Sequence, residues 1–186
     1  MVTYPIVALL DGEVLDPAWI ADITDAANDD NDRITAVEGL LVPPRFRGRQ
    51  SVAQSLTSAV FAPVTFDLED VDNYSGHSTV TNTSRYTAQV AGWYLCSGTV
   101  AFTGNATGRR ASDWMKNGSV LNGSQLAWAP GVSTAVEIPA ATMLITLGVG
   151  DYVEIGAYQE SGGALNTDVA FGQVQSSMSV IYQGAL

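Results

Sequence analysis

Apolar residues between positions 20 and 41 recur at alternating steps of three and four, with one polar residue in the series. This spacing keeps one narrow stripe of a helix facing a partner helix, which is the pattern of a coiled coil. Because the surrounding segment is strongly acidic, we expect the stripe to be buried against other copies of the chain. The stripe consists of Ile20, Ile23, Ala27, Asp30, Ile34, Val37 and Leu41.

The helix that carries this stripe has boundaries in the sequence. Asp16 and Pro17 place an N-cap residue before a proline in the first turn, and the pattern ends near Gly39. We predict an extended arm over residues 1–15 and a coiled-coil helix over residues 16–42. Asp30 has two interpretations: a polar layer that fixes the register and the number of helices at a cost in stability, or the mark of a short, frayed coil.

Basic residues gather directly after the helix. The segment from Pro43 to Arg49 contains two prolines, one glycine and three of the eight basic residues, so we interpret residues 43–50 as a linker. Nine of the nineteen acidic residues lie in the first forty positions, against a single base, Arg33. We expect the basic linker to pair with the acidic arm of a neighbouring subunit.

Residues 51–186 follow a different pattern, with short runs of Val, Thr, Tyr and Phe separated by Gly, Asn and Ser. This pattern predicts an all-β head domain, a sandwich or jelly roll. Asn117-Gly118 and Asn122-Gly123 supply the positive-φ pairs that tight hairpins require, which predicts a small ribbon or a loop between them. The predicted strands cover residues 59–66, 84–90, 93–103, 109–116, 133–138, 142–148, 151–159 and 171–182.

The formal net charge of −11 bears on the partners of the protein. A field of this sign repels phosphate, which argues against nucleic acid and against an anionic bilayer. No apolar run approaches the roughly 20 residues that span a bilayer, and no basic stretch precedes the short apolar run near the N-terminus. We therefore expect a soluble protein that is made in a cytoplasm and does not insert into a membrane.

Residues with catalytic or metal-binding chemistry are few. The chain has one histidine, His77, and one cysteine, Cys96, which lies in an apolar run and is expected to be a buried, inert thiol. A single loop histidine more often has a structural role than a catalytic one, and metal sites built on His and Cys need several such residues. We expect no catalytic residue, no metal and no cofactor.

Two segments admit a binding role. The acidic run at residues 67–72 brings carboxylates close enough to hold calcium, although a solvated loop is the commoner structure for such a run. Trp128 lies in a predicted loop, where an exposed aromatic ring stacks on a sugar or anchors a partner, although packing in the core or at a subunit interface is the default for the aromatic residues of this region. The Asn-x-Ser/Thr triplets at Asn82, Asn105, Asn117 and Asn122 are expected to be turns.

Three stretches of the head match the strands of a known family in order and spacing. They are Ser84–Ala88 with Ala91–Tyr94 and Val100–Phe102, then Gly150–Ile155, and finally Ser177–Tyr182. The first resembles the "glycine, any residue, tyrosine" strand of the complement-type globular head, the trimeric jelly roll shared with tumour necrosis factor. The second and third resemble its late "glycine-aspartate-any-valine" strand and its closing strand. This resemblance implies a mainly β protein whose jelly-roll head forms a homotrimer.

Further segments are similar to proteins that phages of actinobacteria carry. They are Arg109-Arg110, Lys116-Asn117-Gly118, residues 157–163 and the N-terminal residues 11–18. The proteins concerned are tail-fibre, minor tail or head-fibre proteins, so the resemblance implies a virion structural protein whose arm binds other virion proteins. In these phage proteins an asparagine often follows the N-terminal segment that residues 11–18 resemble, whereas this chain has Ala21-Asp22 at that place.

The resemblance implies a trimeric tail fibre or spike whose outward head, residues 51–186, recognises the host surface. Asn105, Asn122 and Trp128 are the candidate receptor contacts, and a host cell-surface glycan is a candidate receptor. The alternative is a head fibre or capsid decoration protein. A remote alternative is a glycan-cleaving enzyme, which requires two facing carboxylates. A secreted signalling ligand of the tumour necrosis factor kind is disfavoured because no secretion signal is seen; the expected location is the virion, after assembly in the host cytoplasm.

Overall fold

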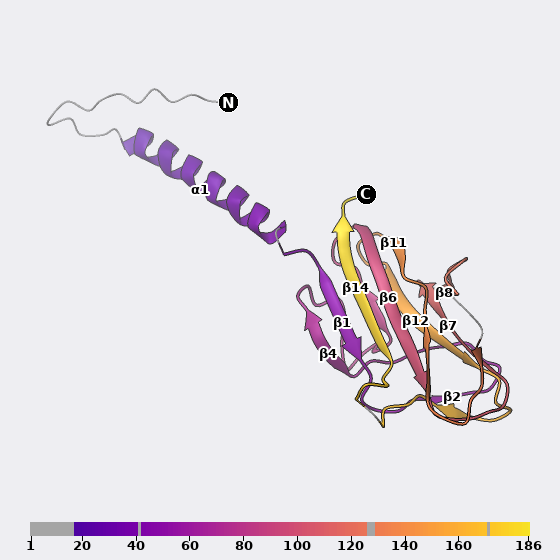
Figure 1. Cartoon of the computed structure of the whole chain (residues 1–186). Helices are drawn as coiled ribbons and strands as arrows, with labels where there is room; N and C mark the ends of the chain where they lie inside the picture. Colours follow the sequence, from indigo (N-terminus) through magenta and orange to yellow (C-terminus); the bar gives the residue numbers. More distant parts are fainter. Residues whose placement is uncertain (1–16, 41, 126–128, 171) are drawn as a thin grey trace. The chain divides into compact units, whose positions relative to one another are not determined.

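A computed structural model describes residues 17–40, 42–125, 129–170 and 172–186 of the chain. The chain divides into two compact units, Met1–Val42 and Pro43–Leu186. The first contains one helix, α1 (Pro17–Leu40), and the second contains the strands (Figure 1). The predicted helix is therefore confirmed, with Pro17 as its first residue, where a proline is tolerated because that N–H has no partner within a helix.

The part of α1 whose side chains are described, Ala18 and residues 21–34, is exposed throughout. Ile23 and Ile34 are 46% and 57% exposed, and Asp30 accepts a hydrogen bond from Arg33 one turn further on, at 3.2 Å. The described residues of the apolar stripe are therefore not buried within the helical unit itself. Its pairing in a coiled coil stays a prediction, and the side chains of Ile20, Val37 and Leu41 lie outside the described residues. In the described part of the chain, no helix combines the length and the hydropathy needed to cross a membrane.

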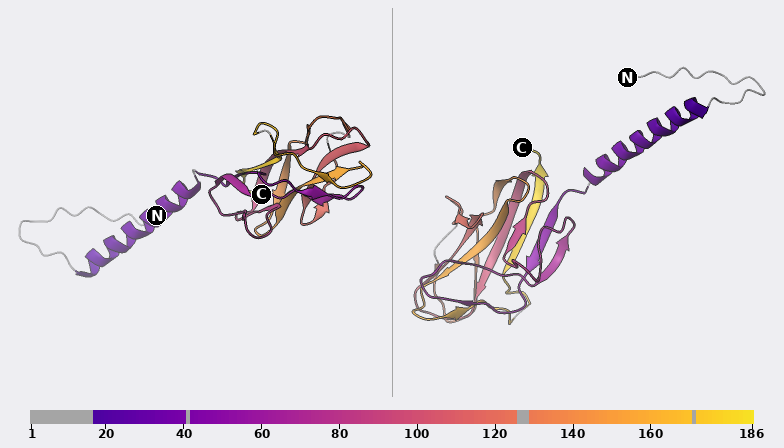
Figure 2. Two further views of the ribbon diagram at one scale, coloured as in Figure 1. Left: turned by 90° about the horizontal axis from the view of Figure 1, so that it is seen from below. Right: turned by 180° about the vertical axis from the view of Figure 1, so that it is seen from behind.

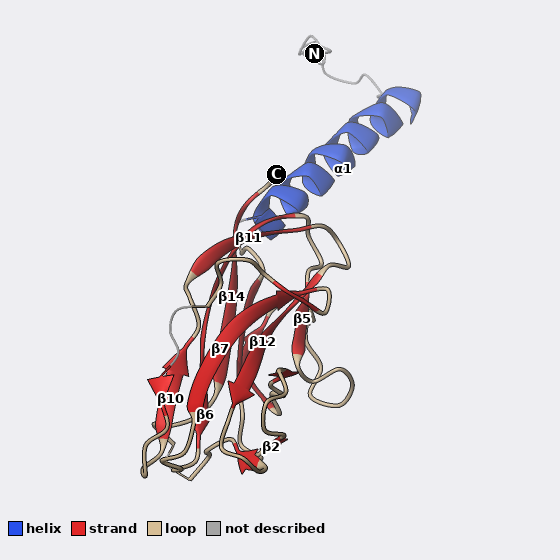
Figure 3. Ribbon diagram, turned by 90° about the vertical axis from the view of Figure 1, so that its right-hand side faces the viewer, coloured by secondary structure: helices blue, strands red, loops and turns tan. Residues whose placement is uncertain are grey.

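The second unit is a sandwich of two antiparallel sheets, each of six strands, which the two further views in Figure 2 show as separate layers. The first sheet has the order β10-β6-β14-β1-β4, and β11 also pairs with β6. The second has the order β3-β12-β7-β8, with β5 beside β12 and β9 beside β7 (Figure 3). A two-stranded ribbon joins β2 to β13. The strands are β1 (Arg45–Arg49), β2 (Ser55–Leu56), β3 (Ala62–Pro63), β4 (Leu68–Asp72), β5 (Arg85–Thr87), β6 (Gly92–Phe102), β7 (Arg109–Lys116), β8 (Ser119–Val120), β9 (Ala129–Pro130), β10 (Val136–Pro139), β11 (Met143–Leu147), β12 (Tyr152–Gln159), β13 (Leu165–Asn166) and β14 (Ser177–Gly184).

The core lies between the two sheets and follows from alternation along the strands. In β6, Tyr94 and Cys96 point inward and are fully buried, whereas Trp93 between the glycine and Tyr94 points outward and is 43% exposed. The second sheet contributes Trp114 and Ile155, both fully buried. The expected burial of the Cys96 thiol is confirmed, and this burial raises the pKa of Cys96 to about 12.

The linker predicted over residues 43–50 is wrong, because residues 45–49 form strand β1 inside the first sheet. The sequence Arg-Phe-Arg-Gly-Arg alternates, so that Phe46 is 1% exposed while the arginines face outward. Arg47 and Arg49 form ion pairs with Asp70 of β4, at 3.2 and 2.8 Å. These two bases are thus paired within the head, and the head unit begins at Pro43 rather than at residue 51.

The acidic run, one predicted strand and one of the two predicted turns differ from expectation. Residues 68–72 form the edge strand β4 instead of a loop. Of the residues predicted as a strand over 59–66, only Ala62–Pro63 form one, β3. Asn117 and Gly118 both have positive φ, 51° and 78°, and form the expected hairpin turn between β7 and β8. At the second pair only Gly123 has a positive φ, so this turn is not of the same type.

Candidate functional site

Two of the three residues predicted to contact a receptor, Asn105 and Asn122, lie in different loops of the described structure. Asn105 lies in the loop between β6 and β7, where its side-chain oxygen accepts a hydrogen bond from the backbone N–H of Thr107 at 2.8 Å. Asn122 is exposed in a turn after β8, in a different loop. Trp128 lies outside the described residues. Of the two described candidates, Asn122 has an exposed side chain and Asn105 a half-buried one.

A buried arginine holds the loop that carries Asn105 in place through hydrogen bonds. The guanidinium of Arg110, which is 1% exposed, donates to the backbone oxygens of Asn105 and Thr107, each at 3.0 Å, and of Arg109 at 2.9 Å. Burial lowers the pKa of Arg110 from its ordinary value. Because its described hydrogen bonds go to backbone carbonyls, Arg110 has a structural role in this loop.

His77 is a structural residue, as a single loop histidine was expected to be. It is 9% exposed, its Nδ1 lies 2.8 Å from Oε1 of Glu69, and its Nε2 lies 3.1 Å from the backbone oxygen of Thr83. Its ring stacks on Phe46, with centroids 4.8 Å apart. Both ring nitrogens are engaged in holding the loop after β4 to the sheet, so the ring is not placed beside a nucleophile such as Cys96, which is buried in the core.

The carboxylates of residues 67–72 are divided among separate protein donors. Asp67 accepts hydrogen bonds from the Ser51 N–H at 2.7 Å and from the Ser51 hydroxyl, and these bonds hold its pKa below the ordinary value although partial burial opposes them. Hydrogen bonds and ion pairs from Arg49 and Arg47 lower the pKa of Asp70. Within the described residues no group of three His, Cys, Asp or Glu side chains is arranged to hold a metal ion. Nothing in this geometry favours calcium over the protein's own donors.

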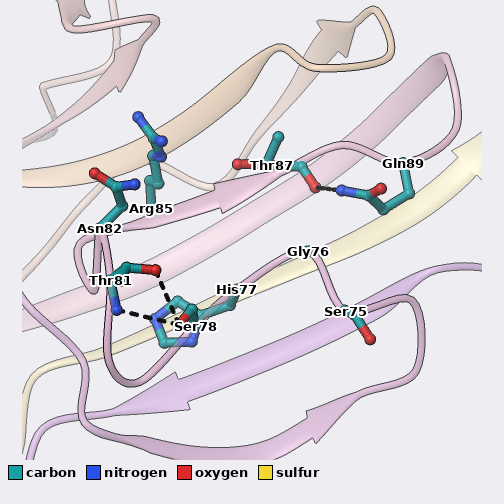
Figure 4. Close-up of a pocket in the computed structure, with 9 residues that line it drawn as sticks. All are labelled: Ser75, Gly76, His77, Ser78, Thr81, Asn82, Arg85, Thr87 and Gln89. Atoms are coloured by element: carbon teal, nitrogen blue, oxygen red, sulfur yellow. Dashed lines mark hydrogen bonds between the residues drawn. The ribbon is translucent and has the colours of Figure 1, made fainter.

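A polar pocket of about 260 Å³ opens where β5 meets the loop between β4 and β5 (Figure 4). Strand β5 pairs with β12 so that Tyr86 enters the core while its neighbours Arg85 and Thr87 face the pocket. The Thr87 N–H donates to the backbone oxygen of Gly76 at 2.7 Å, which fixes the opposite wall. A Cβ atom on Gly76 would lie 2.3 Å from the Tyr86 ring, so glycine is required there. The lining residues are Ser75, Gly76, His77, Ser78, Thr81, Asn82, Arg85, Thr87 and Gln89.

The outward face of the first sheet carries a row of apolar side chains, which we call the apolar row. Leu95 of β6 lies opposite Ile181 of β14 on one side and opposite Leu144 of β11 on the other, and directly opposed residues share one face of a sheet. Trp93 stands two residues from Leu95 on that same face. Trp93, Leu144 and Ile181 are 43%, 53% and 38% exposed. Within the described head unit, four neighbouring apolar side chains on this sheet face are therefore incompletely buried.

The pocket was not predictable from the sequence, and the apolar row was predictable only in part. The pocket assembles residues from three segments between positions 75 and 89, and none of them forms a motif. The apolar row did leave a signal, because residues 93–96 and 180–182 are apolar at both alternating positions, as expected for a strand with two covered faces. From the sequence alone, the aromatic residues of these runs are expected either in the core or at a subunit interface, and the pattern does not distinguish the two.

Comparison with known proteins shows the fold. No protein-family model and no protein with a curated description matches the chain. The solved structure of Eiger TNF from S. frugiperda is similar, with a TM-score of 0.53 and 13% identity over 78% of this chain and 94% of that chain. Murine APRIL at pH 5.0 gives a TM-score of 0.53 and 10% identity over 76% and 100%. The head is therefore a TNF-like jelly-roll sandwich, preceded by one N-terminal helix, and TNF-like domains typically form homotrimers.

Proposed function

We propose that the chain is a structural protein of a bacteriophage virion, a homotrimeric tail fibre or spike whose jelly-roll head recognises the host surface. In this proposal residues 1–15 attach to another virion protein and α1 forms a short three-helix coil. The phage assignment rests on the similarity of residues 11–18, 109–110, 116–118 and 157–163 to actinobacteriophage fibre proteins. Fold alone does not give function, so the role in recognition needs its own test.

The apolar row is the observation that carries the proposal of an oligomer. Contiguous exposed apolar side chains on a soluble protein mark an interaction surface, and a closed symmetric assembly buries the same surface of each copy. The row spans three strands of one sheet, so burying it requires a broad, flat contact rather than a peptide in a groove. Three copies is the number typical of TNF-like domains, and we adopt it for this chain.

The helix supports the same proposal independently. Ile23, Ala27 and Ile34 lie on one stripe of α1 at coiled-coil spacing, and the structure leaves all three exposed within the chain. Since the stripe spans only about three heptads, it is near the lower length limit for a coiled coil. We propose that the coil sets the register of the arms while the heads supply most of the association energy.

Binding of the purified full-length protein to host cells tests the recognition role. We expect saturable binding of the fluorescently labelled protein and competition with adsorption of the intact phage. The matched control is the same protein after thermal unfolding. If the folded trimer neither binds cells nor slows adsorption, it is not the recognition protein; in that case its presence on isolated tail-less heads would identify a head fibre or capsid decoration protein.

A further inference from the structure

The charges of the head leave one arginine facing the polar pocket. Residues 43–186 contain ten acidic and seven basic residues, a formal charge of −3, so most of the chain's net charge of −11 belongs to the N-terminal unit. Four of the seven bases form ion pairs with carboxylates, and Arg110 is buried among backbone carbonyls. Arg85 forms no ion pair with any described carboxylate. A cation of this kind, at the wall of a pocket, is available to an external anion.

The Arg85 guanidinium is held by an aromatic ring and donates no hydrogen bond to the described residues. Its guanidinium carbon lies 4.5 Å from the centroid of the Tyr152 ring, so the planar group stacks on the aromatic face and loses little freedom when it binds a ligand. The nearest acidic residue across the strands, Glu154, accepts a hydrogen bond from the Ser84 hydroxyl at 2.6 Å instead. The two parallel N–H groups of a guanidinium match the two oxygens of a carboxylate.

The remaining walls supply the groups that recognise sugar hydroxyls. Asn82 and Arg85 extend to the same side of the loop in Figure 4, and Thr87 follows on the same strand. Two lining residues, Ser75 and Asn82, have left-handed backbone, with φ of 53° and 52°, a strained conformation that places side chains in unusual directions. The Ser78 hydroxyl accepts the N–H groups of Val80 and Thr81, both at 3.2 Å, which stiffens the loop.

We propose that this pocket binds a carboxylate-bearing sugar, a hexuronic acid, at the end of a host-surface glycan. Arg85 binds the carboxylate through two N–H groups, and the Asn82 amide and the Thr87 hydroxyl bind ring hydroxyls. The volume of about 260 Å³ is smaller than typical sites for drug-sized ligands, so it accommodates one sugar ring. The host surface as the source of the glycan rests on the proposed function; the binding chemistry rests on the pocket alone.

Ligand-observed NMR titration of the full-length protein with sodium glucuronate and with glucose tests the inference. We expect glucuronate to bind and glucose to bind at least about tenfold more weakly, because a charge-assisted bidentate contact is lost. Arg85→Gln should weaken glucuronate binding by a similar factor. The matched control, Arg33→Gln, removes the same charge from the exposed face of α1 and should leave binding unchanged.

A second variant separates loss of the carboxylate contact from loss of folding. Asn82→Asp keeps the size of the side chain and tolerates left-handed backbone, but it places a negative charge in the pocket. We expect wild-type thermal stability and loss of glucuronate binding. Equal binding of glucose and glucuronate, or unchanged binding by Asn82→Asp, would refute the carboxylate site, and binding of neither sugar would refute the pocket. Host-cell binding by a protein that fails these titrations would leave the proposed function intact and locate recognition elsewhere.

Discussion

Substitution of Leu144 by serine tests whether the apolar row holds the trimer together. Leu144 is 53% exposed in the single chain, so about half of its side chain remains to be buried by association. Full burial of a leucine side chain contributes about 1.5–3 kcal/mol, which leaves about 1 kcal/mol per subunit and about 3 kcal/mol per trimer. At 1.4 kcal/mol for each factor of ten, the trimer association constant should fall by roughly a hundredfold.

Sedimentation equilibrium over a dilution series measures this change. Because the midpoint concentration of a monomer–trimer equilibrium scales with the square root of its constant, we expect the midpoint to rise about tenfold. The matched control is Val120→Ser, which replaces a residue of similar exposure, 49%, on β8 of the other sheet and should leave the midpoint unchanged. Equal midpoints for Leu144→Ser and Val120→Ser would show that the apolar row is not the subunit interface.

Three further predictions address the coil, the core and an ion pair. Replacing Ile23 and Ile34 together with Asp should weaken trimers of the full-length chain, and an unchanged trimer at low concentration would show that the stripe does not contribute. Cys96 should not react with a thiol reagent at about pH 8 in the native protein and should react after denaturation, since its pKa is raised to about 12; rapid native reaction would contradict its burial. Hydrogen bonds and an ion pair from Lys116 hold the pKa of Asp151 below its ordinary value. The ionised carboxylate therefore stabilises the fold at pH values above the pKa that Asp151 has in the unfolded chain, and this stabilisation is lost as the pH falls through its lower pKa in the folded protein. Asp151→Asn should therefore lower Tm at neutral pH and flatten the decrease of Tm towards acid, as measured by circular dichroism; a Tm profile identical to wild type would contradict this role.

The helix and the longer strands were predictable because their signals are local. Pro17 marks the start of α1, and the runs rich in β-branched and aromatic residues at 93–103 and 151–159 match the strands β6 and β12. The Asn117-Gly118 turn was predictable for the same reason, since few residue pairs adopt positive φ at both positions. The family resemblance added the arrangement of these strands, which local signals do not contain.

Strands that owe their structure to tertiary partners were missed. Arg45–Arg49 has the composition of a linker, but Phe46 fills the core and Asp70 neutralises two of the outward arginines, so the segment becomes a strand between β14 and β4. Residues 68–72 form an edge strand because they pair with β1 and because Asp70 forms ion pairs with Arg47 and Arg49. The pocket around Arg85 could not be predicted, because it depends on the stacking of that side chain on Tyr152 and on the close approach of Gly76 to Tyr86.

Electron microscopy of phage particles labelled with an antibody against the head tests the proposed function most directly. The account predicts label at the tail of intact particles, on fibres or spikes, with the heads of the trimer pointing away from the particle. Label confined to the capsid surface would contradict the assignment as a tail fibre and favour a head fibre or decoration protein. Particles that carry no label at all would contradict the assignment to the virion.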